Sequence, residues 1–163
     1  MATEHRHEGG PDPLSAPALL DAAMGTALRA RGLPPEELPE AWILTRPEEV
    51  AAVHAAHAAA GARLLLTCSF NATESRLAAR GLEGKLEALC GRAERLARAA
   101  AAGSAVVAGG LGPSGLSGSP SPPEWREVFA RPWKALAAAG VDLLWAETHW
   151  RLGEARAALW AGR

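Results

Sequence analysis

The 163-residue sequence is poor in several features that would point to particular classes of protein. Its two cysteines, Cys68 and Cys90, are too few for the disulfide framework of a small secreted protein, so a reducing cytoplasm is the expected location. The net charge of −1 gives no electrostatic reason to expect nucleic acid or an anionic membrane as a partner. No apolar run approaches the roughly 18 residues that a membrane helix requires.

What remains is the composition of a globular domain, with 48% hydrophobic and 21% charged residues. Residues 1–17 are polar and contain histidine, glycine and proline, so we expect a disordered N-terminal tail there and one folded domain over residues 18–163. A complete (β/α)₈ barrel takes about 250 residues, and about 200 at the lower limit. We therefore expect the chain to be too short to close one.

Four short apolar segments, bounded by residues that break regular structure, are typical of buried parallel strands. They cover residues 18–24, 63–70, 105–111 and 141–146. Each is followed by a stretch long enough for a helical crossover. Strands that alternate with helices in this way predict an α/β fold with a parallel sheet and four βα units.

Capping signals and glycines give the expected helix boundaries. A capping box formed by Thr45 and Glu48 predicts a helix over residues 47–60, and Gly103 ends the next helix. A second capping box, Ser121 with Glu124, opens a helix that ends at Gly140. Proline at position 132 predicts a kink or a break near residue 130 of that helix. The last helix is expected over about residues 150–161.

Ligands of parallel α/β folds bind beyond the carboxyl ends of the strands. Here those ends carry Asp21, followed by Gly25 and Thr26, then residues 67–70, 110–115, and Glu147 with Thr148. Two carboxylates from different strands, Asp21 and Glu147, are therefore expected at one mouth. Such a pair could bind an ammonium group, hold a metal, or act as acid and base. Alternatively, each carboxylate could cap the helix that follows it.

The segment 110–115 matches the pattern G-x-G-x-x-G of dinucleotide-binding folds, but its context argues against that function. Pro113 removes a backbone donor that would cradle a pyrophosphate, and no helix begins until about Ser121. We expect a flexible turn within a long, mobile loop over residues 109–123.

The histidines and cysteines give weaker signals. His54 and His57, three residues apart on one helix, are expected to pack or to face solvent, because no third metal ligand is near them in the sequence. His149 follows Glu147 on the presumed ligand face. Cys68 lies at a strand end, whereas Cys90 is expected mid-helix on the outside of the layer, so the two are not expected to share a metal.

Several of these segments resemble motifs of the homocysteine S-methyltransferases, which include betaine–homocysteine methyltransferase and the homocysteine module of cobalamin-dependent methionine synthase. The resemblance begins with Leu-Leu-Asp-Ala-Ala-Met-Gly-Thr at residues 19–26. It continues through residues 41–48, His54, 60–62, 67–70, 108–115 and 140–148, in the family's order and spacing. Five motifs in register make the match specific, over about residues 17–163.

The resemblance implies the N-terminal half of an eight-stranded (β/α)₈ barrel and transfer of a methyl group to the sulfur of homocysteine, which gives methionine. Asp21 and Glu147 would hold the amino-acid end of homocysteine, with Glu147 contacting its ammonium group. The substrate-binding residues implied are Asp21, Gly25, Thr26, Thr67, Glu147 and Thr148.

In the family, three cysteine thiolates hold a zinc ion to which the homocysteine sulfur binds as a thiolate. Those cysteines follow later strands than this sequence contains, and Cys68 falls where the family usually has asparagine. We therefore expect no catalytic residue and no metal ligand in this chain, and no indication of the methyl donor. Ala22, Ile43 and Pro132 are further departures from the family pattern. The chain is expected to be a fragment, a split subunit or a decayed gene product that is inactive alone.

Two other functions remain open from the sequence. The chain could be a non-enzymatic half-barrel that dimerises or docks on a partner half, because its first and fourth strands would otherwise have bare edges. It could also be a small α/β hydrolase that uses Asp21 and Glu147 as acid and base.

Overall fold

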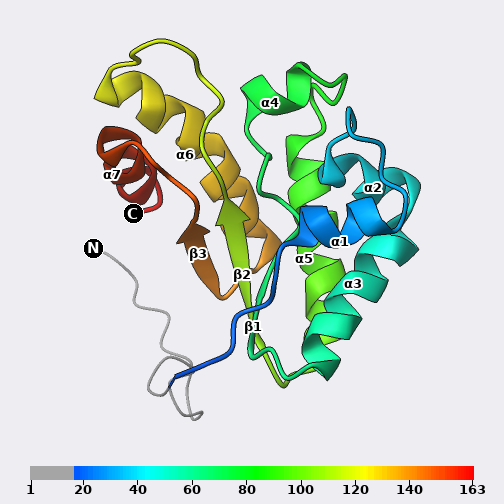
Figure 1. Cartoon of the computed structure of the whole chain (residues 1–163). Coiled ribbons are helices and arrows are strands. Elements are labelled where there is room, and N and C mark those ends of the chain that lie inside the picture. The colour runs from blue at the N-terminus through cyan, green and yellow to red at the C-terminus, as the bar shows by residue number, and fades with distance from the viewer. Residues whose placement is uncertain (1–16) are drawn as a thin grey trace.

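The structure, a computed structural model, describes residues 17–163 (Figure 1). The tail expected at the N-terminus therefore lies outside the described residues, except for its last residue. Within residues 17–163 the order of elements is α1 (Met24–Ala30), α2 (Pro39–Thr45), α3 (Pro47–Ala59), β1 (Leu64–Leu66), α4 (Glu74–Ala78), α5 (Leu86–Ala101), β2 (Val106–Leu111), α6 (Pro122–Ala139), β3 (Leu143–Ala146) and α7 (Leu152–Ala161). None of these helices has both the length and the hydropathy needed to cross a bilayer.

The three strands form one parallel sheet in the order β1-β2-β3, which confirms the α/β class. Leu64 pairs with Val106, and Ala108 pairs with Leu143. Helices α3 and α5 lie toward the β1 side of the sheet and α6 and α7 toward its β3 side, with α5 and α6 packed against each other (Figure 1). All three strands run in one direction, so their carboxyl ends meet at one edge of the sheet.

The strand expected over residues 18–24 is wrong as a full strand. Leu20 forms only an isolated parallel bridge with Leu64, and α1 begins at Met24. The Asp21 N–H still donates to the Leu64 carbonyl, at 3.0 Å. In a regular parallel ladder the next bond would run from the Leu66 N–H to the Asp21 carbonyl. The Asp21 carboxylate takes that N–H instead, at 3.0 Å, and the strand ends there. The structure therefore has three strands and a bridge where four strands were expected.

The other expected strands differ mainly in length. The strand at 105–111 is confirmed as β2, whereas β1 covers only three of the residues 63–70. Beyond Leu66 the chain turns, because the hydroxyls of Thr67 and Ser69 bond to each other and to β2. Strand β3 begins at Leu143, two residues later than expected, because the Asp142 carboxylate accepts the Val107 N–H.

Helix α6 begins as expected, because the Ser121 N–H and hydroxyl both donate to the Glu124 carboxylate at 2.7 Å. It continues past Pro132 to Ala139, so of the kink or break predicted near residue 130 the break is wrong. Proline removes one helical hydrogen bond, but Phe129 and Trp133 on either side of it are buried in the core. Tertiary packing of both flanks therefore keeps the helix continuous.

The first capping box is wrong. Residue 45 ends α2 instead of capping α3, and its hydroxyl donates to the Ala41 carbonyl at 3.1 Å. Arg46 is the N-cap of α3, and no side chain caps that helix. Helices α1, α2 and α4, short segments of five to seven residues, were not predicted from the sequence. Short helices carry too few turns for a periodic pattern to be distinct.

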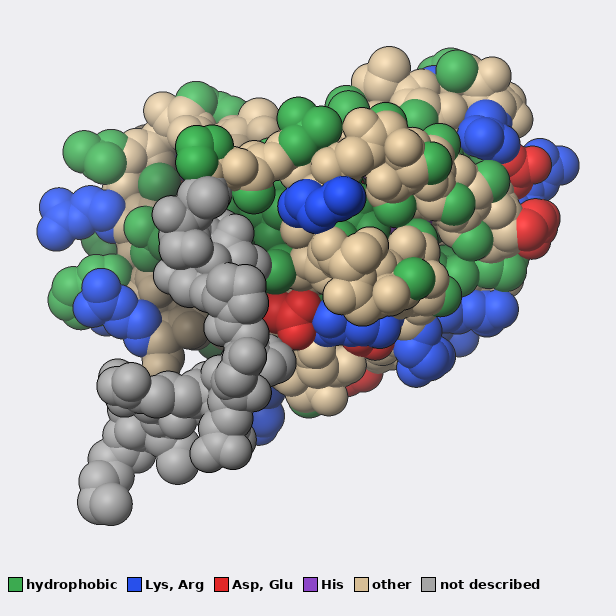
Figure 2. All heavy atoms as spheres, turned by 90° about the horizontal axis from the view of Figure 1, so that it is seen from below, with side chains coloured by type: hydrophobic (Ala, Val, Ile, Leu, Met, Phe, Trp, Pro, Cys, Tyr) green, Lys and Arg blue, Asp and Glu red, His purple; other side chains and the backbone are tan. Residues whose placement is uncertain are grey.

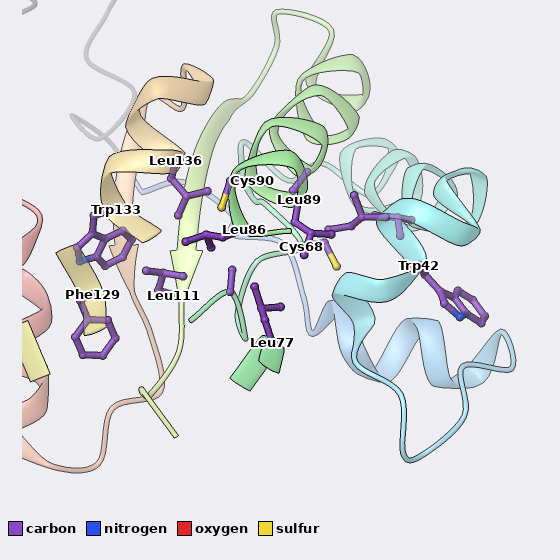
Figure 3. Close-up of a cluster of buried hydrophobic side chains, with 14 of the residues drawn as sticks. Trp42, Cys68, Leu77, Leu86, Leu89, Cys90, Leu111, Phe129, Trp133 and Leu136 are labelled. Carbon is purple, nitrogen blue, oxygen red and sulfur yellow. The ribbon is translucent and has the colours of Figure 1, made fainter. Parts of the chain in front are cut away.

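The main core lies where α5 and α6 pack beside β2 (Figure 3). Leu86 and Leu89 of α5, Leu136 of α6 and Leu111 of β2 all belong to this cluster (Figure 3). Cys90 belongs to this cluster and is fully buried, so its expected position on the outside of the layer is wrong. On the face in Figure 2, acidic and basic side chains are interspersed with apolar ones, in keeping with the small net charge.

Candidate functional site

A pocket of about 390 Å³ lies where the carboxyl ends of β1 and β3 meet the start of α1. The structure brings to it all six residues singled out in the sequence. These are Asp21, Gly25, Thr26, Thr67, Glu147 and Thr148. They come from segments far apart in the chain, and parallel strands gather them because such strands end at a common edge.

Asp21 lies in the wall of this pocket, with its side chain only 3% exposed. Its Oδ2 atom accepts the Leu66 N–H at 3.0 Å and lies 3.9 Å from His57 Nδ1. Burial and, to a smaller extent, the nearby Glu147 carboxylate raise the pKa of Asp21 to about 7, against the Leu66 hydrogen bond, which lowers it. Asp21 is therefore partly protonated near neutral pH when no cation is beside it.

Glu147 follows β3 directly, and its backbone N–H donates to the Leu111 carbonyl at 3.0 Å. Burial raises the pKa of its carboxyl group as well. A Cβ atom at position 110 of β2 would lie 2.9 Å from Glu147 Oε1, so the glycine there leaves room for the carboxylate. The next residue, Thr148, has a positive φ of 59°, a conformation that is uncommon outside glycine and often found at functional sites.

A chain of hydroxyl groups supports the floor of the pocket. Thr67 Oγ1 and Ser69 Oγ are 2.6 Å apart, and Ser69 Oγ donates to the Gly110 carbonyl at 2.8 Å. The Gly110 N–H donates to Thr67 Oγ1 at 3.3 Å. This network joins the end of β1 to β2, and the Thr67 hydroxyl is therefore engaged in holding the pocket together.

Sequence reasoning missed Glu40, a carboxylate in the pocket lining that is only 1% exposed. Glu40 Oε1 accepts the Asn71 N–H at 2.7 Å, and Oε2 accepts from Asn71 Nδ2 at 3.3 Å. Arg76 Nη1 in turn donates to Asn71 Oδ1 at 3.2 Å. Burial raises the pKa of Glu40 in spite of these bonds. An acidic residue inside the apolar segment 38–44 was the signal that could have found it.

The glycine-rich segment after β2 is held in place up to residue 115, which corrects the expected mobile loop. Glu154, itself 3% exposed, accepts from both the Ser114 N–H, at 2.7 Å, and the Ser114 hydroxyl, at 2.5 Å. The Ser114 carbonyl accepts from Thr73 and Ser75, and Arg76 donates to the Pro113 carbonyl. These contacts fix the loop against α4 and α7.

Backbone hydrogen bonds in this segment argue against a dinucleotide-binding site. The N–H groups at positions 110 and 112 donate to Thr67 and to the Phe70 carbonyl, and the Ser114 N–H donates to Glu154. Because these donors are already used within the protein, they do not form a cradle for phosphate.

Comparison with known proteins identifies the fold family. The model of the homocysteine S-methyltransferase family matches residues 18–163. The chain belongs to the homocysteine S-methyltransferase family.

Among its relatives is the homocysteine S-methyltransferase of Escherichia coli strain K12, which is 39% identical over 152 residues. That alignment covers 80% of this chain and 49% of the relative. Crystal structures of the homocysteine methyltransferase MmuM from Escherichia coli are also similar, at 32% identity. The metallated form gives a TM-score of 0.80 over 92% of this chain and 63% of that one. The apo form gives 0.72 over 92% and 58%. The chain thus spans about half the length of the curated relative.

The residues of this homocysteine S-methyltransferase homologue do not fit the zinc site that the family resemblance implies. Within residues 17–163 no group of three or more histidine, cysteine or acidic side chains lies close enough together to hold a metal ion. Cys68 lines the pocket, but burial raises the pKa of its thiol well above the usual range. Burial raises the pKa of Cys90, in the core, to about 12. Without a metal both thiols therefore stay protonated, and neither has around it the further ligands that a zinc site requires.

The histidines of the described segment, residues 17–163, do not complete a metal site either. His54 is fully buried in the packing of α3, with neither ring nitrogen hydrogen-bonded, and burial lowers its pKa to about 4. His149 is not in the pocket lining, and its ring meets Phe129 edge-on with centroids 5.5 Å apart. His57 differs from His54 and His149, because its Nδ1 atom lies 3.9 Å from the Asp21 carboxylate.

Proposed function

We propose that the pocket binds the amino-acid end of homocysteine, with Glu147 and Asp21 holding its ammonium group. The observation that carries this proposal is that the two carboxyl groups, one beside β1 and the other directly after β3, line one pocket and interact electrostatically. Charge-assisted hydrogen bonds from an ammonium group would satisfy both. Gly25, Thr26, Thr67 and Thr148 would complete the pocket around the same end of the ligand.

The electrostatics of the pocket favour a cation. Burial raises the pKa of both Asp21 and Glu147. Within the described residues neither carboxylate has a positive partner at hydrogen-bond distance that would offset this rise. A bound ammonium group would supply that partner and lower both pKa values. Binding of homocysteine is therefore expected to release protons from the pocket at pH 6–7.

We propose further that the complete activity is methyl transfer to the sulfur of homocysteine, and that this chain supplies the amino-acid-binding half of a (β/α)₈ barrel. Zinc would supply the homocysteine thiolate, and the two protonated cysteines of this chain do not provide its ligands. The 163-residue chain is therefore expected to bind homocysteine without methylating it. Free cysteines are in keeping with a cytoplasmic location.

A partner for this half is favoured by its open edge. Along β3 every residue is only half-buried. Large apolar side chains near it are exposed, namely Trp150, Leu152, Leu159 and Trp160. A second half-barrel, on another chain or in a homodimer, would cover them. Light scattering is expected to show self-association or a complex, and a stable, soluble monomer would count against this part of the proposal.

Calorimetric titration of the full chain with L-homocysteine tests the binding function, with L-homoserine as a ligand that has a hydroxyl in place of the thiol. Binding is expected for the unaltered chain, and at least about tenfold weaker binding for Glu147→Gln. A thermal-shift comparison with glycosides tests the alternative of an α/β hydrolase, since a true ligand raises the melting temperature. Stabilisation by a glycoside and not by homocysteine would support that alternative. One tightly bound zinc per chain, together with turnover of homocysteine, would contradict the expected inactivity.

A further inference from the structure

His57 on α3 lies beside Asp21 but outside the lining of the pocket. Its side chain is 17% exposed and does not line the pocket. Its Nδ1 atom is buried and has no hydrogen-bond partner, and it lies 3.9 Å from Asp21 Oδ2. That distance is too long for a hydrogen bond and short enough for an ion pair.

We propose that His57 is a positioning residue of the amino-acid pocket, which fixes the Asp21 carboxyl group and, when protonated, keeps it ionised for an ammonium ligand. The inference rests on the proposed function for its consequence in binding. The contact between the imidazole and the carboxylate stands on geometry alone. Asp21 Oδ2 is oriented from two sides, by the Leu66 N–H of β1 and by the His57 ring of α3.

Among residues 17–163, no other cationic side chain forms an ion pair with Asp21. Several charged groups of the neighbouring helices bind other partners. Arg29 of α1 donates to backbone carbonyls including Leu33, Glu40 of α2 accepts from Asn71, and Glu94 of α5 pairs with Arg98. On α3 itself the nearest titratable group is His54, whose pKa is lowered in part by His57. From β3, Glu147 adds a negative charge beside Asp21.

The pair should share a proton near neutral pH. Burial raises the pKa of Asp21 to about 7 and lowers that of His57 below its usual 6.5. Taken separately, Asp21 would take the first proton as the pH falls. The opposite charges of the pair, 3.9 Å apart, raise the pKa of His57 and lower that of Asp21, so the first proton can reside on either group. When it resides on His57, Asp21 remains a carboxylate and can accept an ammonium hydrogen bond. Without the imidazole, the proton resides on Asp21, and the ligand loses this partner at a higher pH.

A titration of the ligand-free chain by NMR tests the contact directly. The His57 ring is followed from pH 4 to 9 in the unaltered chain and in Asp21→Asn. Removing the negative charge is expected to lower the pKa of His57 by about one. An unchanged His57 titration in Asp21→Asn would overturn the inference, whatever the chain binds.

The pH dependence of L-homocysteine binding tests the consequence. In His57→Phe and His57→Gln the loss of binding on acidification is expected to occur about one pH unit higher than in the unaltered chain. His57→Gln separates the charge from the polar shape, because glutamine cannot carry a proton. Ala56→His, which places the same ring on the neighbouring exposed position, is expected to leave the pH profile unchanged.

The two proposals fail differently. If the unaltered chain binds no homocysteine at any pH while the His57 titration responds to Asp21→Asn, the proposed ligand is wrong and the pairing stands. If homocysteine binds and the profiles of His57→Phe and His57→Gln coincide with that of the unaltered chain, His57 is packing only and the inference is overturned.

Discussion

Gly110 of β2 lies against the carboxylate of Glu147. A Cβ atom at position 110 would be 2.9 Å from Glu147 Oε1, while the other neighbours, atoms of Leu66, would be at 3.6 Å or more. The β2 backbone thus determines how close the carboxylate can come to the sheet. A glycine in the strand interior normally weakens a strand, so its presence here has a reason in the site.

Gly110→Ala is therefore expected to separate binding from stability. The carboxylate is the far end of a flexible side chain and can move aside, so the free energy of unfolding should change by less than about 1 kcal/mol. Its displacement should weaken homocysteine binding at least about tenfold, measured by calorimetry. Gly91→Ala, in α5 with its nearest contact at 3.5 Å, is the matched control. It should raise stability by about 0.5–1 kcal/mol and leave binding intact. Unchanged binding in Gly110→Ala would contradict the role of Glu147.

Asp21→Asn is expected to change the pH dependence of stability. Because the pKa of Asp21 is about 7 in the folded chain and 3.8 as its ordinary value, the unfolded chain loses this proton first. Stability therefore falls as the pH rises from about 4 to about 7 and stays lower above that. The asparagine variant lacks this titration, so its unfolding midpoint in urea should decline less over the same range. A steeper decline would show that Asp21 is stabilised as a carboxylate in the folded chain.

Glu154→Ala is expected to release the loop after β2. It leaves the Ser114 N–H and hydroxyl buried without their acceptor, at a cost of about 3 kcal/mol in the free energy of unfolding. Glu154→Gln retains an acceptor oxygen and should lose about 1 kcal/mol. The exposed Glu127→Ala on α6 should stay within about 0.5 kcal/mol of the unaltered chain. Equal losses for Glu154→Ala and Glu127→Ala would show that the loop is held by other contacts.

Both thiols are expected to be unreactive in the folded chain. With its pKa raised from 9.0 to about 12, the thiolate fraction of Cys90 falls about a thousandfold, and burial blocks access to both cysteines. Labelling by a thiol reagent should therefore be slow in buffer and complete in denaturant. Rapid labelling of one thiol in buffer would place that cysteine at the surface, and the variant Cys68→Ala would tell which it is.

The pocket could be located from the sequence although one of its strands was predicted wrongly. Asp21 does not lie in a strand of seven residues, yet a single bridge at Leu20 is enough to align it with the end of β1. Strand ends in a parallel sheet share one edge, so a candidate site there tolerates errors in strand length. The continuity of α6 through Pro132 could not be predicted from the sequence, because the packing of Phe129 and Trp133 outweighs the local preference of proline.

Local signals were sufficient for the α/β class, for β2, for the helix start at Ser121 and for the set of polar residues at the strand ends. Each of these depends on neighbours in the chain or on the rule that parallel strands end together. Tertiary structure alone decided that Glu40 is buried against Asn71, that Cys90 lies in the core, and that His57 faces Asp21. Those relationships join segments that no short-range pattern connects. They follow from how helices pack on the sheet, which only the folded chain specifies.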